Sequence, residues 1–174
     1  LDPTHERAAA LVEPLLGAEP EALSRFLEQR ADHAADPRER VDLLLRAANL
    51  RGDGAVELLG KALLAAPNRD DVLVALEAAP GARPEVLLHH FGRAAEAASD
   101  PQVRRRILAR IARLHEAQED GGPRALEAWR RVLAGAPADA EAAAAVERLL
   151  EASADAEGLI HDLEQRLARA ANEE

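Results

Sequence analysis

The 174-residue sequence lacks cysteine, methionine and tyrosine, and it contains only one tryptophan and two phenylalanines. Without cysteine, the chain has no disulfide, no thiol nucleophile and no cysteine-ligated metal centre. Aromatic residues at 2% of the chain leave little material for stacking nucleic-acid bases or lining an aromatic pocket. Stretches without a charged residue, such as Val86–Gly92, are far shorter than the ~20 residues that span a membrane. These absences exclude thiol chemistry and argue against membrane insertion.

Lysine is nearly absent as well. It occurs once, at Lys61, and arginine supplies the rest of the 22 basic side chains. Together with the abundance of alanine, this bias is typical of a GC-rich bacterial genome. Because the chain begins at Leu1 and has no methionine, we interpret it as a module of a larger bacterial protein. Its localisation stays open, with the cytoplasm slightly favoured.

The residues that are present describe a folded helical chain. Hydrophobic residues make up 48% of the sequence and charged residues 31%, so wholesale disorder is excluded. Alternating runs rich in β-branched residues, which indicate strands, are nearly missing. Apolar residues instead recur at helical spacing, as at Ile107, Leu108, Ile111 and Leu114. The sequence therefore predicts an all-α protein.

Proline, glycine and aspartate divide the chain into about ten short helices. Asp36-Pro37 and Asp100-Pro101 are typical helix starts, because aspartate caps the first turn and proline is tolerated within it. The expected breaks lie near residues 17–20, 36–37, 52–54, 67–69, 80–84, 100–101, 120–123, 137 and 153–155.

The prolines expected to open alternate helices are regularly spaced. Pro3, Pro37, Pro67, Pro101 and Pro137 lie 34, 30, 34 and 36 residues apart. A period of this length that holds two helices is typical of stacked helical hairpins. We therefore expect one domain over residues 1–174, a right-handed α-solenoid of about five hairpins. Their expected ranges are 3–35, 37–66, 68–98, 101–136 and 138–171.

The fourth hairpin resembles a tetratricopeptide repeat. It has large, apolar, small and aromatic-like residues where that family has them on the first helix, at Leu108, Ile111, Ala112 and His115. The second helix matches through Ala125, Trp129, Val132 and the closing Pro137. A weaker match in the second hairpin consists of Leu44, Ala47, Ala48, Ala55, Leu59, Ala62 and Pro67. The odd hairpins depart from the pattern, with glutamate at the expected small position, as Glu13, Glu77 and Glu147.

This resemblance implies a superhelix that holds partners. Proteins or peptide tails would lie in a concave groove lined by the first helix of each hairpin. In such an array, the side chains of Arg106, Ala109, Arg113 and Glu116 would face the groove.

Residues for catalysis or metal binding do not form a recognisable motif. A helical zinc site needs two ligands three or four residues apart and a third elsewhere. The candidates pair one histidine with a glutamate, as His115 with Glu119, or His161 with Glu157 or Glu164. The three serines lie outside any Gly-x-Ser-x-Gly motif, and the glycine pairs lack the lysine of a phosphate loop. We predict no catalytic residue, no metal ion and no cofactor.

Charge is distributed unevenly along a chain of net charge −10. The first to fifth segments, 1–37, 38–66, 67–100, 101–137 and 138–174, carry net charges of −5, +1, −3, +4 and −7. The basic segment places Arg106, Arg110 and Arg113 on one helical stripe. Because guanidinium groups pair with carboxylates, one hypothesis is that this stripe, with Glu116, binds an acidic segment or C-terminal carboxylate of a partner. The alternative is a solvated helix face that the acidic fifth hairpin partly neutralises.

Other partners follow from the ends and from the overall charge. Nucleic acid fits the same arginines poorly, because the negative net charge opposes a polyanion. The N-terminal helix is apolar over much of its circumference and is expected to pack against an earlier repeat or a second copy, through Ala8–Ala10, Leu11, Val12, Leu15 and Leu16. The last helix, about 156–170, has one apolar and one polar face, which is typical of a cap, and its polar tail ends at residues 172–174.

The sequence thus predicts a non-enzymatic protein–protein interaction scaffold, with a protein or peptide partner and no nucleic acid. One alternative is a structural spacer or self-assembly module that uses its stacking ends. Another is an accessory domain of a multidomain enzyme.

Overall fold

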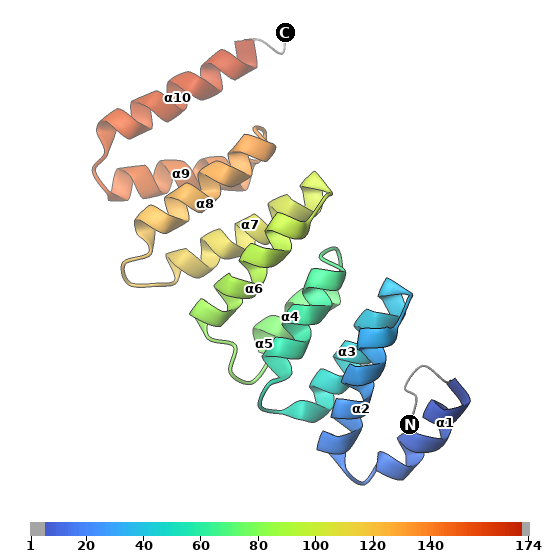
Figure 1. The fold of residues 1–174 in the computed structure, drawn as a ribbon. Coiled ribbons are helices and arrows are strands. Elements are labelled where there is room, and N and C mark those ends of the chain that lie inside the picture. Colours follow the sequence, from blue (N-terminus) through green and yellow to red (C-terminus); the bar gives the residue numbers. More distant parts are fainter. Residues whose placement is uncertain (1–5, 172–174) are drawn as a thin grey trace. The chain divides into compact units, whose positions relative to one another are not determined.

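The computed structural model describes residues 6–171, with the side chains of residues 11–155, 157–165 and 168. This part of the chain forms ten α-helices and no strand, which confirms the all-α prediction (Figure 1). The helices are α1 (Glu6–Leu16), α2 (Pro20–His33), α3 (Pro37–Arg51), α4 (Ala55–Ala65), α5 (Asp70–Ala78), α6 (Pro84–Ala97), α7 (Pro101–Glu116), α8 (Gly122–Gly135), α9 (Ala140–Ala152) and α10 (Ala156–Ala171).

The helix starts have the predicted local chemistry. Asp36 accepts a hydrogen bond from the backbone N–H of Arg38 at 2.9 Å, and Asp100 accepts one from Gln102 at 2.8 Å. A proline occupies the first turn after each of these caps, where its missing N–H has no helical partner to lose. The start of the first hairpin expected at Pro3 lies outside the described residues.

Pro67 and Pro137 do not open helices, and this part of the prediction is wrong. α5 begins at Asp70 and α9 at Ala140, three residues after each proline. The residues before the prolines leave the helical region with nearly the same backbone angles, φ −144° and ψ 80° at Ala66, and φ −146° and ψ 80° at Ala136. A proline ring clashes with a helical residue before it. These two prolines therefore end one hairpin rather than start the next.

The helices group into two compact units, Leu1–Ala98 and Ser99–Glu174. In the first unit, α1 packs against α2, α2 against α3, and α3 against α4, while α5 and α6 both pack against α4 (Figure 1). Its largest fully buried side chains are Phe91, Leu27, Leu58, Leu63, Leu73, Leu76, Val41 and Val72.

The second unit is smaller and is built in the same manner. α7 packs against α8, α8 against α9, and α9 against α10. The largest side chain of its core is Trp129, which is 2% exposed. The side chains of Ile107, Val132 and Leu150 are also fully buried. In both units the helices thus pack in neighbouring pairs.

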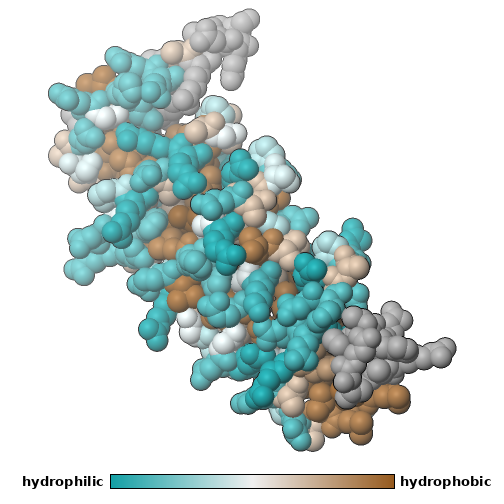
Figure 2. Space-filling view, viewed as in Figure 1, coloured by the Kyte–Doolittle hydropathy of each residue, from teal (hydrophilic) through white to brown (hydrophobic). Residues whose placement is uncertain are grey.

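The surface in view is mostly hydrophilic, with apolar side chains gathered at the N-terminal helix (Figure 2). Leu11 and Leu15 of α1 are 71% and 79% exposed. No helix within residues 6–171 combines the length and the apolar character needed to cross a membrane.

Candidate partner-binding site

The four residues predicted to bind a partner lie on α7, beside its buried face. Arg106, Arg110 and Glu116 are half-buried, and Arg113 is exposed. The buried face of the same helix consists of Val103, Ile107, Leu108, Ile111 and Ala112. Arg106 and Arg110 each have an interaction within the molecule, so neither is a free cation.

Arg113 binds a carboxylate of the protein itself. Its Nε donates to Oε1 of Glu141 at 2.9 Å, and its Nη2 donates to Oε1 and Oε2 at 2.6 and 2.7 Å. The guanidinium carbon also lies 5.9 Å from the ring centre of Trp129, within cation–π range. Glu141 of α9 therefore occupies the forked donor groups of Arg113, which were predicted to bind the carboxylate of a partner.

Glu116 joins three helices. Its Oε1 accepts a hydrogen bond from the indole Nε1 of Trp129 on α8 at 2.5 Å, and its Oε2 accepts one from Arg148 on α9. Only 22% of the Glu116 side chain is exposed. The bond to Glu116 gives the buried indole N–H the partner that it needs, because an unpaired polar group in a core is costly. These contacts assign Glu116 a role in holding the unit together.

Arg105, another arginine of α7, binds the start of α9. Arg105 donates to Oδ2 of Asp139 at 2.5 Å, while Oδ1 of Asp139 accepts from the backbone N–H of Ala142 and caps the helix. The cap and the ion pair both favour the charged carboxylate, and they lower the pKa of Asp139 in spite of its burial. Sequence reasoning predicted the neutralising acidic hairpin as an alternative but did not identify these pairs.

The first unit has the same kind of bonding. Glu13 of α1 accepts from Arg30 of α2 at 2.7 Å and from Arg46 of α3 at 2.6 Å. The glutamate that departs from the tetratricopeptide pattern in the first hairpin is therefore an ion-pair partner for the next two helices. These bonds connect α1, α2 and α3 within one cluster.

One helix further on, a second glutamate repeats this arrangement. Glu28 of α2 accepts from Arg51 of α3 at 2.9 Å and from Lys61 of α4 at 2.7 Å. The bond from Lys61 is the largest cause that lowers the pKa of Glu28. The chain's only lysine is thus part of the bonding between helices.

Four of the ion pairs between helices have nearly the same sequence separation. Glu13–Arg46 and Glu28–Lys61 each span 33 residues, Glu116–Arg148 spans 32 and Arg105–Asp139 spans 34. Each pair connects a helix, or the cap of a helix, with the next but one along the chain. Opposite charges one period apart are therefore the sequence signal that could have revealed them.

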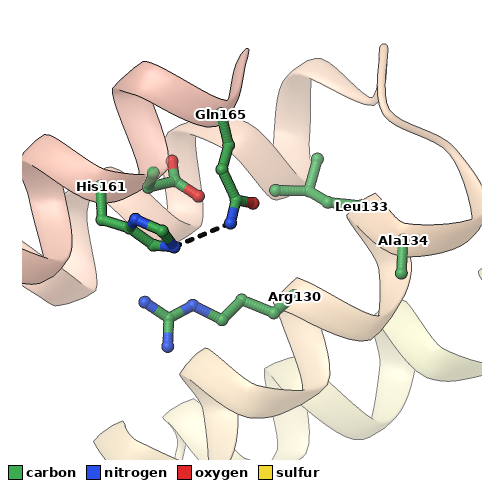
Figure 3. Close-up of a pocket in the computed structure, with 6 residues that line it drawn as sticks. Arg130, Leu133, Ala134, His161 and Gln165 are labelled. Carbon is green, nitrogen blue, oxygen red and sulfur yellow. Dashed lines mark hydrogen bonds between the residues drawn. The ribbon is translucent and has the colours of Figure 1, made fainter. Parts of the chain in front are cut away.

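A pocket between α8 and α10 is lined by an exposed cation, Arg130 (Figure 3). The pocket has a volume of about 360 Å³, and the guanidinium of Arg130 points toward His161 and Gln165, which are hydrogen-bonded at 2.8 Å. The lining residues are Arg130, Leu133, Ala134, His161, Asp162 and Gln165. Arg130 is exposed, and its guanidinium has no hydrogen bond or ion pair with any described residue.

Among the side chains that the structure describes, no further ligand joins the histidine–glutamate pairs considered for metal binding. Within residues 6–171, no three histidine, aspartate or glutamate side chains are grouped so that they could hold a metal ion. His161 is instead part of the pocket beside Arg130, and His115 is half-buried at the end of α7.

No protein-family model matches the chain, and comparisons with curated proteins and with solved structures found no match.

Proposed function

We propose that the chain is a non-enzymatic helical-repeat scaffold that holds a protein or peptide partner. The observation that carries this proposal is the bonding between helices one repeat apart, at separations of 32–34 residues. Stacked repeats present an extended surface whose shape is fixed by contacts between neighbours. Such stacking would give the solenoid that the tetratricopeptide resemblance implies, and the usual work of that family is to bind other proteins.

We place the partner's carboxylate at Arg130 rather than on the α7 stripe. Arg113 and Glu116 are occupied by Glu141, Trp129 and Arg148, whereas Arg130 opens into the pocket. A guanidinium offers a forked donor set to a carboxylate. An acidic side chain of a peptide would supply that carboxylate. The prediction that Arg106 and Arg110 contact a partner stays a prediction.

The test compares three forms of the full chain as bait for proteins from the source organism. Arg130→Gln removes the pocket cation, and Arg124→Gln removes an exposed arginine of the same helix that does not line the pocket. A protein retained by the wild type and by Arg124→Gln, but lost from Arg130→Gln, would support the scaffold and the site. Equal retention by all three forms would keep the scaffold proposal but move its site. If none of the three forms retains a protein, the scaffold proposal is overturned.

The exposed apolar face of α1 favours self-assembly as a second candidate function. Leu11 and Leu15 are the most exposed large apolar residues of the described chain. The first 37 residues carry a net charge of −5, so two copies would repel one another until salt screens them. We expect association measured by sedimentation velocity to increase with salt and to disappear in Leu11→Gln/Leu15→Gln. A wild-type monomer at all salt concentrations would overturn this candidate.

A further inference from the structure

One histidine of the first unit is buried between two helices. His90 on α6 is 6% exposed, and its neighbour His89 lies on the solvent side of the helix, with the two ring centres 5.4 Å apart. The Nε2 atom of His90 is buried and has no hydrogen-bond partner among the described residues. A buried imidazole without a partner is stable only as the neutral form, because the protonated ring needs water or a bonded anion.

The imidazole of His90 lies in a notch that a glycine leaves open. A Cβ atom at Gly60 of α4 would lie 2.2 Å from Nδ1 and 2.3 Å from Cε1 of the His90 ring. No real side chain makes contacts that short, so the ring occupies the space of the missing methyl group. The notch therefore holds the ring against the α4 backbone.

The charged and titratable groups around the ring come from α4 and from α6 itself. Glu57 of α4 has its Oε1 3.6 Å from Nε2 of His90, but its side chain is 72% exposed and therefore well hydrated. His89 and Arg93 of α6 oppose a positive charge on the ring, and Glu57 favours it. Burial is the largest effect, and it lowers the pKa of His90 below the ordinary value for histidine.

We propose that the contact between α4 and α6 is a pH-sensitive joint, in which protonation of His90 at mildly acidic pH releases α6 from α4. Within the first unit, α4 is the helix against which α6 packs most extensively. A charged ring gains water by leaving the notch, and this movement separates the two helices. The joint is a regulatory feature of the first unit and does not depend on the scaffold proposal.

The direction of the effect follows from the two states of the ring. The released state binds the proton with an ordinary histidine pKa of about 6.5, and the docked state binds it more weakly. Docking is therefore unaffected well above pH 6.5 and weakens as the pH falls below that value. At pH 5.5, one unit below the ordinary pKa, the population of the released state rises about tenfold over that at pH 7.5.

The test is hydrogen exchange of the α6 backbone amides in the full chain, at pH 7.5 and pH 5.5, each corrected for the intrinsic chemical rate. We expect the corrected exchange of α6 in the wild type to increase by up to about tenfold at pH 5.5. His90→Gln, which cannot be protonated, should show the same corrected exchange at both pH values. His89→Gln is the matched control on the same helix, and it should keep the wild-type response.

Two results would overturn the joint. One is a corrected exchange of α6 that does not change with pH in the wild type, and the other is an equal change in His90→Gln. If His90→Gln does not fold, an NMR titration of the histidine rings in the wild type decides the matter. The ring of His90 must titrate below the ordinary histidine pKa of about 6.5, and a midpoint at that value would reject the proposal.

Discussion

Two glycines in helices of the first unit differ in what surrounds them. At Gly60 on α4, an added Cβ would overlap the His90 ring, whereas at Gly92 on α6 no atom lies within 4 Å of the Cβ position. A glycine inside a helix destabilises it by about 1 kcal/mol relative to alanine. Packing against His90 therefore requires glycine at position 60, whereas glycine at position 92 only lowers the stability of α6.

Gly60→Ala should destabilise the first unit, since the new methyl group must displace the His90 ring. Overpacking of this kind costs about 1–3 kcal/mol. Gly92→Ala is the matched control, and it should stabilise the same unit by about 0.5–1 kcal/mol through helix propensity. Urea unfolding followed by circular dichroism measures both. A stabilising Gly60→Ala would show that the ring is not held in the notch.

The sequence identifies such residues but not their environment. His89 and His90 are adjacent and chemically equivalent in the sequence, yet only His90 is buried. The difference arises because α6 brings its residue 90 against residue 60 of α4, and no local pattern contains that contact. For the same reason, Gly60 in the sequence is only a weak point in an apolar helix.

Among whole helices, the end of α9 has an unusual residue. Ala154 has φ 54°, and it is the only non-glycine residue with positive φ in the described chain. The N–H of Asp155 bonds to the carbonyl of Leu150 and the N–H of Ala154 bonds to that of Glu151, which is the Schellman arrangement that glycine normally completes.

Ala154→Gly should stabilise the second unit by about 0.5–1 kcal/mol, because it removes the steric cost of a Cβ in the left-handed region. Ala152→Gly, within the last turn of α9, is the control and should destabilise the unit by a similar amount. Thermal unfolding distinguishes the two variants. A loss of stability in Ala154→Gly would mean that the turn is not held in this conformation.

The ion pairs of α9 should differ in strength, because their burial differs. The Asp139 side chain is 10% exposed and also caps α9, whereas Glu141 and its partner Arg113 are each 54% exposed. We expect Asp139→Ala to cost about 1–2 kcal/mol of stability. Glu141→Ala should change stability by less than about 1 kcal/mol, because solvent screens an exposed pair. Urea unfolding at neutral pH tests this order, and an equal cost for both variants would contradict it.

Asp139 should also make the stability of the protein depend on pH, and the direction of this effect follows from its lowered pKa. A carboxyl group with a lowered folded pKa stabilises the protein above its unfolded pKa of about 4, and this contribution is lost as the pH falls through the lowered value. Acid should therefore reduce the stability of the wild type more steeply than that of Asp139→Asn, which keeps a cap but cannot titrate.

The starts of α3 and α7 could be predicted from the sequence, but the partner of Arg113 could not. Asp36-Pro37 and Asp100-Pro101 act within one turn, so their effect is local and readable. Arg113 was assigned to a groove because its stripe is visible in the sequence. Arg113 instead binds Glu141, which lies 28 residues further along the chain. This contact depends on how α9 packs in the second unit.

At the scale of the whole molecule, the core of each unit reflects its size. The first unit spans residues 1–98 and the second spans residues 99–174. Because the second unit is the shorter one, it buries less surface on folding. The period of the prolines predicted a repeating chain, and it contains no signal for a division after Ala98. The expected single domain stays a prediction.

Unfolding should proceed separately in the two units. Trp129 is the only tryptophan, and its buried indole reports on the second unit alone, whereas far-ultraviolet circular dichroism reports on all helices. We expect the fluorescence midpoint to lie about 5 °C below that of circular dichroism, because the smaller unit is the less stable one. A Phe26→Trp/Trp129→Phe variant moves the probe to the first unit. Superimposable curves from both probes would show one cooperative unit.

The chain's single lysine and single tryptophan lie in different units, so they can report the distance between those units. Lys61, the only lysine, lies on α4 of the first unit with its side chain 52% exposed, and Trp129 lies on α8 of the second. With the α-amino group blocked, an amine-reactive acceptor on Lys61 and the indole donor would form an energy-transfer pair without any substitution. The transfer efficiency would respond to bending between the units, so mechanical flexibility becomes measurable in the native sequence.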